Sequence, residues 1–274
     1  MSTGQRRLQV ALSHLLTDDR MRAALRNRPA EVRNRYCLTS DEFRLLVSLD
    51  SARLELTAHA GEGKRLDFLR RGMPMTVGAV ERAHRAELLF DHVRASWAAD
   101  GPVLTSRILR ECRQFVVHLE GADLTGLPAW IRDIAQFELA AAELAASVEA
   151  SADAERAQRE TVHSGPVVLG RHVRVLSFAW DIVSLRTGAA SGNPKPFAAT
   201  STHLALVKSR AQPPLQGYRI GEQVAQILRG CVSPTDVHAV LTTLPGREVQ
   251  VAATIRTALS AGLLLTAKPT APGT

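Results

Sequence analysis

One pair of residues in the N-terminal half has the spacing of a metal site. Glu81 and His84 form a Glu-x-x-His motif, which di-iron helix bundles use twice, together with two further glutamates on other helices. We do not recognise that full arrangement in this chain and therefore predict that it holds no metal and no cofactor. His92 and His118 stand singly and are interpreted as surface or core histidines.

A second motif suggests phosphate binding. Residues 61–64 read GEGK, but the first glycine of a Walker motif is missing, Arg65 stands where Ser or Thr is required, and no strand precedes the motif. The sequence also lacks a nucleophile elbow, a cysteine and histidine cluster with zinc spacing, and a dinucleotide fingerprint. We therefore predict no catalytic residues, which favours a binding protein or an accessory subunit over an enzyme.

The composition is that of a globular protein large enough for two domains. The 274 residues are 45% hydrophobic and 22% charged, and no apolar run approaches the length of a membrane span. The first residues, MSTGQRR, lack the apolar region of a signal peptide. Three widely separated cysteines, Cys37, Cys112 and Cys231, indicate reduced and mostly buried thiols. We expect a cytoplasmic protein.

Positive charge is concentrated in the C-terminal part. Residues 1–160 carry 23 Lys and Arg against 23 Asp and Glu, whereas residues 161–274 carry 11 against 4. An acidic partner would be drawn to this part of the chain, although the same charge could simply keep the protein soluble.

The periodicity of apolar residues predicts a helical domain over residues 1–160. Short helices are expected in residues 1–72, where Thr39 and Glu42 form a capping box, and longer helices in residues 73–160. A stretch of small and polar residues near 146–166 indicates the boundary. An α+β domain is predicted over residues 161–266, followed by a disordered tail at 267–274.

Residues 202–262 form the most distinctive part of the second domain. Two runs, 202–210 and 215–221, have a hairpin pattern, and an alternating run near residues 173–180 adds a third strand. Three compact helical patterns follow the hairpin. Ser233 and Pro234 are predicted to start the second of these helices and Gly262 to end the third. The domain is therefore predicted to be winged-helix-like, with a three-stranded antiparallel sheet and three helices.

The chain resembles a family of partner proteins. The block LPAWIRDIAQFELAAAELA (residues 127–145), the preceding MPMTVGAVE, the following HVRVLSFAWDIVSL and the hairpin with three helices are similar to the partners of multinuclear non-heme iron oxidative enzymes. These are the methanobactin-type (MbnC-like) proteins of ribosomal-peptide natural-product pathways. The resemblance covers most of the chain, is strongest in residues 73–265 and is thin before residue 40.

The resemblance implies a non-catalytic subunit that binds the leader of a precursor peptide. It implies a heterodimer with an iron enzyme that supplies the metal, and a C-terminal recognition element on which the leader adds as a strand. The edge strand would be residues 215–221, flanked by a helix at 248–261. The implied peptide-contacting residues are Leu215, Tyr218, Arg219, Ile220, Arg247, Val249 and Arg256. Candidates for the contact with the enzyme are Trp130, Arg132, Asp133 and Glu138, of which Trp130 is equally a core candidate.

A winged-helix transcriptional regulator is the alternative hypothesis, because a hairpin with three helices also describes that fold. Its recognition helix should present several polar side chains to base edges. The candidate helix, EVQVAATIRTALSA, offers Gln250 and Arg256 among small apolar residues. That composition suits a peptide groove better than the major groove of DNA.

Overall fold

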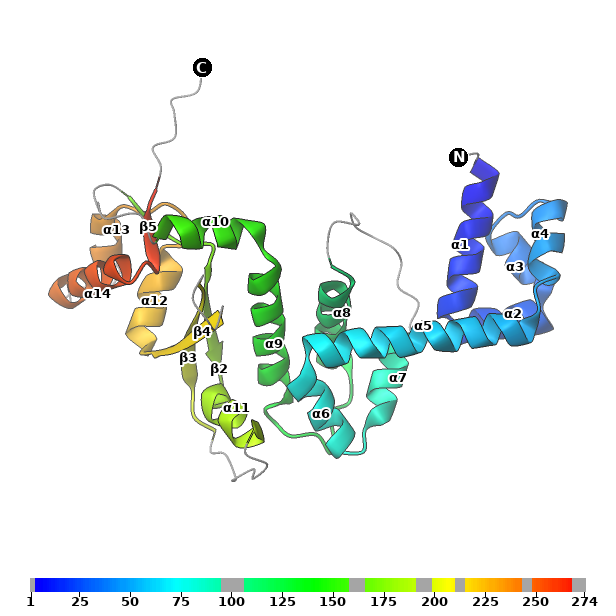
Figure 1. Cartoon of the computed structure of the whole chain (residues 1–274), viewed down its shortest axis with the longest axis horizontal. Coiled ribbons are helices and arrows are strands. Elements are labelled where there is room, and N and C mark those ends of the chain that lie inside the picture. Colours follow the sequence, from blue (N-terminus) through cyan, green and yellow to red (C-terminus); the bar gives the residue numbers. More distant parts are fainter. Residues whose placement is uncertain are drawn as a thin grey trace, which may run out of the picture. The chain divides into compact units, whose positions relative to one another are not determined.

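A computed structural model of the chain describes residues 3–94, 106–157, 166–190, 199–209, 215–242 and 248–267. The chain divides into two compact units, Met1–Ile131 and Arg132–Thr274 (Figure 1). The first unit is helical, and the second combines helices with small antiparallel sheets, which confirms the predicted fold class. In the described part of the chain, no helix is both long and apolar enough to cross a membrane.

The first unit begins with short helices whose ends are set by capping residues. Its helices are α1 (Thr3–Thr17), α2 (Asp19–Asn27), α3 (Pro29–Arg35), α4 (Ser40–Val47), α5 (Ser51–Gly72), α6 (Pro74–Arg82), α7 (Ala86–Arg94) and α8 (Arg107–Gly121). The capping box of Thr39 and Glu42 is present at the start of α4, as predicted. Asp18 and Asp50 cap α2 and α5 through their side chains.

Two sets of buried side chains hold this unit together. The first set lies between the helices α1, α2, α3 and α4 and consists of Ala11, Leu15, Met21, Val32, Leu38 and Leu46. Around α5 and α8, the fully buried side chains include Leu69, Met73, Leu89, Phe115 and Leu119. Burying such side chains contributes about 1.5–3 kcal/mol each, so these apolar stripes stabilise the unit.

The structure shows the backbone conformation of the two motifs that suggested phosphate or metal binding. Gly61 to Lys64 lies within α5 and is regular helix rather than a phosphate loop. Within residues 73–160, where longer helices were predicted, the helical pattern is interrupted at His84, because this residue has a φ of 56° and the chain turns between α6 and α7. Glu81 and His84 therefore do not share a helix face, and Glu81 pairs instead with Arg70 on α5 at 2.9 Å.

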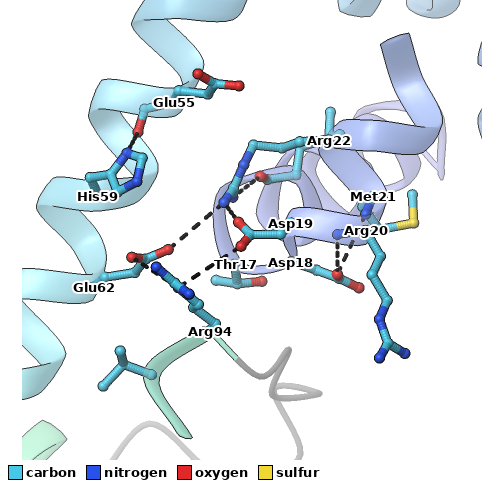
Figure 2. Close-up of polar contacts among 12 residues, drawn as sticks. Thr17, Asp18, Asp19, Arg20, Met21, Arg22, Glu55, His59, Glu62 and Arg94 are labelled. Carbon is cyan, nitrogen blue, oxygen red and sulfur yellow. Dashed lines mark hydrogen bonds and ion pairs between the residues drawn. The ribbon is translucent and has the colours of Figure 1, made fainter. Parts of the chain in front are cut away.

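A network of charged side chains joins three helices of the first unit (Figure 2). Arg22 on α2 is buried and pairs with Asp19 and, at 3.7 Å, with Glu62 on α5. It also donates a hydrogen bond of 2.9 Å to the carbonyl of Leu15. Arg94, at the end of α7, approaches Glu62 at 3.7 Å. The buried guanidinium is thus compensated by carboxylates from two helices, as a buried charge requires.

The second unit contains both sheets. Its helices are α9 (Ile131–Ala146), α10 (Val148–Ala157), α11 (Ile182–Ala190), α12 (Glu222–Gly230), α13 (Val237–Thr242) and α14 (Glu248–Ser260). Its strands are β1 (Val167–Leu169), β2 (Val173–Phe178), β3 (Thr202–Lys208), β4 (Leu215–Ile220) and β5 (Leu264–Thr266).

The main sheet is antiparallel in the order β2-β3-β4, which confirms the predicted hairpin and its third strand. A separate two-stranded sheet pairs β1 with β5 near the chain's C-terminal end. Gly262 has a φ of 69° and follows α14, as predicted. The start of α13 differs from the prediction: it begins at Val237, where the Asp236 side chain accepts from the amide of His238, rather than at Pro234.

Helices cover the two faces of the main sheet. Phe178, Lys208 and Arg219 lie on one face, named here the α9 face, where Phe178 meets Phe137 of α9 edge to face. On this face the Lys208 ammonium donates to the carbonyls of Ala145 and Ser147, at the end of α9. The opposite face, named the α12 face, carries Ser177, Val175, Tyr218 and Ile220, with the Arg229 guanidinium of α12 donating to Ser177 Oγ at 2.5 Å.

These contacts explain why the units divide earlier than the expected boundary at residue 160. α9 belongs with the second unit because it packs on the α9 face of its sheet, and α10 because it contacts β3. Additional hydrogen bonds link α10 to this unit: Asp153 accepts from the amide of Arg171, and Arg156 donates to the carbonyl of Thr266. The expected boundary at residues 160 and 161 and most of the expected tail, residues 268–274, lie outside the described residues.

A buried histidine, His172, holds the turn between β1 and β2. His172 is 2% exposed, and its Nε2 donates to the carbonyl of Gly262 at 2.8 Å. Nδ1 has no hydrogen-bond partner among the described residues, so a proton there would be buried without an acceptor. Burial lowers the pKa of His172, although the Gly262 carbonyl and Asp153 oppose the shift.

We expect the second unit to lose stability as the pH falls below about 6.5, the pKa of an unfolded histidine. The folded state resists protonation of His172 while the unfolded state accepts it, so this contribution is full above that pH. Amide hydrogen exchange of β1, corrected for intrinsic rates, should accelerate between pH 7.5 and 5.5. His172→Gln should flatten this dependence, whereas the exposed control His238→Gln should leave it unchanged. Equal pH dependence in all three proteins would contradict the role of His172.

Candidate peptide-binding edge

Strand β4 is an edge of the main sheet. Among the described residues it pairs only with β3 in the strand order, from His203 opposite Ile220 to Lys208 opposite Leu215. In an antiparallel edge strand, alternate residues direct their N–H and C=O groups away from the sheet. Three consecutive residues, Gly217, Tyr218 and Arg219, are exposed. The strand therefore offers unpaired backbone groups to which an extended peptide can bond.

On the α12 face, β4 contributes one anchored and one exposed large side chain. Ile220 packs against the apolar core that α12, α13 and α14 form around Leu228, Cys231 and Ile255. Tyr218 is 48% exposed, and its hydroxyl donates to Gln216 Oε1. Of the predicted contacts on this strand, Ile220 is thus mainly a core residue, whereas Tyr218 is available to a ligand.

On the α9 face, Arg219 is engaged within the protein. Its guanidinium pairs with the carboxylate of Asp181 and donates to Ser184 Oγ at 3.2 Å, which ties β4 to α11. Burial disfavours the charge on Asp181, yet hydrogen bonds from Ser184 and Arg219 outweigh it and lower the pKa of the carboxyl. The resemblance implied that Arg219 contacts the leader peptide, and the sequence offered no signal that Asp181, 38 residues away, would pair with it.

The helix that was predicted to flank β4 is α14, and its main contacts are with other helices and with β5. α14 buries Val251, Ile255 and Ala258 and packs on α12, α13 and β5, whereas α12 packs on β2 and β3. Val249 is 84% exposed and Arg256 is also exposed, so both lie on the open face of α14. Arg247 lies outside the described residues.

Comparison of the sequence with protein-family models and with curated proteins found no match. The assignment of a function therefore depends on the sequence and on the geometry of β4.

The residues predicted to contact an enzyme have different environments. Glu138 is buried, and the Asp133 carboxylate accepts from the backbone amide of Trp180 at 3.0 Å. Trp130 is half-buried just before α9, and Arg132 is exposed. Of the four residues, Arg132 has the exposure that a docking residue needs.

Of the two histidines that the sequence analysis singled out in the first unit, His92 lies in the interior and His118 is half-buried. His92 on α7 is fully buried, and its Nε2 lies 3.3 Å from Glu111 Oε2 on α8. Glu111 also accepts from Arg65 Nε on α5 at 3.0 Å. No group of three or more potential ligands that could hold a metal ion is found among the described residues.

Protonation states in this buried network follow from its geometry. Burial lowers the pKa of His92, and Glu111 opposes the shift. Burial would raise the pKa of Glu111, but the hydrogen bond from His92 and the charge of Arg65 prevail and lower it. A carboxylate, a neutral imidazole and a guanidinium thus connect three helices, which is a structural role.

Proposed function

We propose that the chain is a non-catalytic partner subunit that binds the leader of a ribosomally synthesised precursor peptide. In this proposal the leader adds as a strand to β4, and the subunit presents the precursor to an iron-dependent oxidative enzyme with which it forms a heterodimer. The iron and the oxidative chemistry belong to that enzyme. Since such precursors are made and modified inside the cell, we propose that the protein acts in the cytoplasm.

The single observation that carries the proposal is the open edge of β4 in a winged-helix-like unit. Hydrogen bonds from the β4 backbone would supply affinity without regard to sequence, and side chains at alternate positions would supply specificity. Tyr218 suits the second role because its ring offers a large contact area at a small entropic cost. Leu215 and the aliphatic part of Arg219 flank Gly217 on the α9 face.

Fluorescence anisotropy with a labelled precursor peptide tests the proposal. The molecules to test are any short precursor peptide and any iron enzyme that neighbouring genes encode. We expect binding at micromolar concentrations or tighter, and co-purification of the chain with the iron enzyme. The absence of both complexes at micromolar concentrations would refute the proposal.

The transcriptional-regulator alternative predicts a different result in the same assays. Its recognition helix would be α14, whose exposed residues include Val249, Gln250 and Arg256. One apolar and two polar side chains form a poor reading surface for base edges. A salt-dependent, sequence-selective shift of duplex DNA, without peptide binding, would favour the regulator.

A further inference from the structure

A hollow on the first unit gathers arginine side chains. It has a volume of about 420 Å³ and lies between α1 and the end of α3. Its lining residues are Arg6, Arg7, Val10, Arg35, Tyr36 and Cys37. We name it the arginine hollow. All three arginines in it are exposed, so their guanidinium groups are accessible to a ligand.

These three guanidinium groups lack the carboxylate partners that several neighbouring arginines have. Arg22, Arg26, Arg28 and Arg44 each form an ion pair with an Asp or Glu. In the described residues no ion pair involves the arginines of the hollow. Arg7 donates to the carbonyl of Cys37 at 3.3 Å, and Arg35 approaches the sulfur of Met21 at 3.5 Å.

The sequence around the hollow is unusually basic. Residues 1–36 contain eight Arg and three Asp or Glu. The Asp18 carboxylate, which caps α2, acts on Tyr36 of the hollow, but this single negative charge is outnumbered by the three arginines. Positive charge therefore remains in the hollow, and an anion bound there would relieve the repulsion between the guanidinium groups.

The surroundings of the arginines indicate the class of anion. A guanidinium presents a planar set of donors that matches a carboxylate or a phosphate. Val10 is 43% exposed and Tyr36 is half-buried, so apolar surface lies among the charges. Carboxylates combined with an apolar side chain are features of a peptide. Among the neighbouring arginines, Arg22, Arg26, Arg28 and Arg44 are paired with carboxylates, and these pairs interrupt the basic surface that a nucleic acid would follow.

We propose that the arginine hollow binds an acidic peptide segment of a partner protein. Carboxylates of that segment contact Arg6, Arg7 and Arg35, and an apolar side chain lies against Val10 and Tyr36. The site is in the first unit and does not depend on the function proposed for β4.

Cys37 supplies a reporter for this site. It lines the hollow and is exposed, whereas Cys112 and Cys231 are buried. Iodoacetamide should therefore alkylate Cys37 first in the full-length protein, as mass spectrometry can verify. A short glutamate-rich peptide with one central leucine should slow this alkylation at least about tenfold at saturation, and salt should weaken the protection. Tripolyphosphate and a single-stranded oligonucleotide are the other two probes.

The matched variants are R6Q/R35Q within the hollow and R71Q/R110Q on exposed helix surface elsewhere in the same unit. Both remove two positive charges, so a non-specific charge effect would act equally on them. We expect R6Q/R35Q to weaken the peptide at least about tenfold, or about 1.4 kcal/mol, and R71Q/R110Q to change it little. Circular dichroism checks that both variants fold. Protection of Cys37 by the peptide in the unmodified protein tests the proposal even if a variant fails to fold.

Four results would overturn the proposal. They are no protection by the peptide, equal weakening in both variants, protection by tripolyphosphate alone, and protection by the oligonucleotide equal to that by the peptide. Because the assay reads Cys37 in the first unit, its failure would leave peptide binding at β4 untouched.

Discussion

Replacing Arg65 with methionine is expected to destabilise the first unit by about 3–5 kcal/mol, the usual effect of removing one partner of a buried ion pair. Glu111 is 8% exposed and would keep only the hydrogen bond from His92. The helices joined by this network, α5, α7 and α8, should all be affected. Amide hydrogen exchange of α8 measures the change for this unit separately from the other.

Two further variants identify the cause of that loss. Arg71→Met removes the same charge from an exposed position of α5 and should change stability by less than about 0.5 kcal/mol. Adding Glu111→Gln to Arg65→Met removes the unpaired charge but keeps an acceptor for His92, so it should restore a large part of the stability. A double variant as unstable as the single one would show that the charge is not the cause.

Truncating Tyr218 to alanine is expected to weaken precursor binding by about 2 kcal/mol, or about thirtyfold, as for a central aromatic contact. The ring is exposed on the edge strand and its hydroxyl contacts Gln216 on the same strand, so folding should change little. Anisotropy titrations measure the binding, and circular dichroism the fold.

Tyr218→Phe should bind nearly as well as the unmodified chain, because the ring supplies most of the contact area. Val232→Ala truncates another exposed side chain of the second unit and should have no effect. Unchanged binding by Tyr218→Ala would exclude this residue as an anchor.

Local features of the fold could be predicted from the sequence because neighbouring residues determine them. The capping box at Thr39, the hairpin of β3 and β4, and the glycine after α14 each depend on residues within a few positions. The break at His84 was missed because its apolar neighbours continue a helical period on both sides. The start of α13 was also misjudged, since Asp236 competes with Ser233 as a cap.

The site could be predicted only in part because its partners are distant in sequence. The resemblance implied that β4 is an edge strand, and the strand order and the exposure of Tyr218 agree with this. The pairing of Arg219 with Asp181 and the hydrogen bond of Asp133 to Trp180 link residues 38 and 47 positions apart. Periodicity carries no information about such contacts. The arginine hollow was missed for the same reason, since it forms between α1 and the end of α3.

Residue-resolved hydrogen exchange of β4, with and without saturating precursor peptide, tests the central claim most directly. If the leader adds as a strand, amides at alternate positions of Leu215–Ile220 should become strongly protected, because only those groups face the open edge. Exchange in β3, whose two edges are already paired, should change much less. Protection confined to α14 or to β2, or no protection of β4 under saturating peptide, would contradict strand addition at this edge.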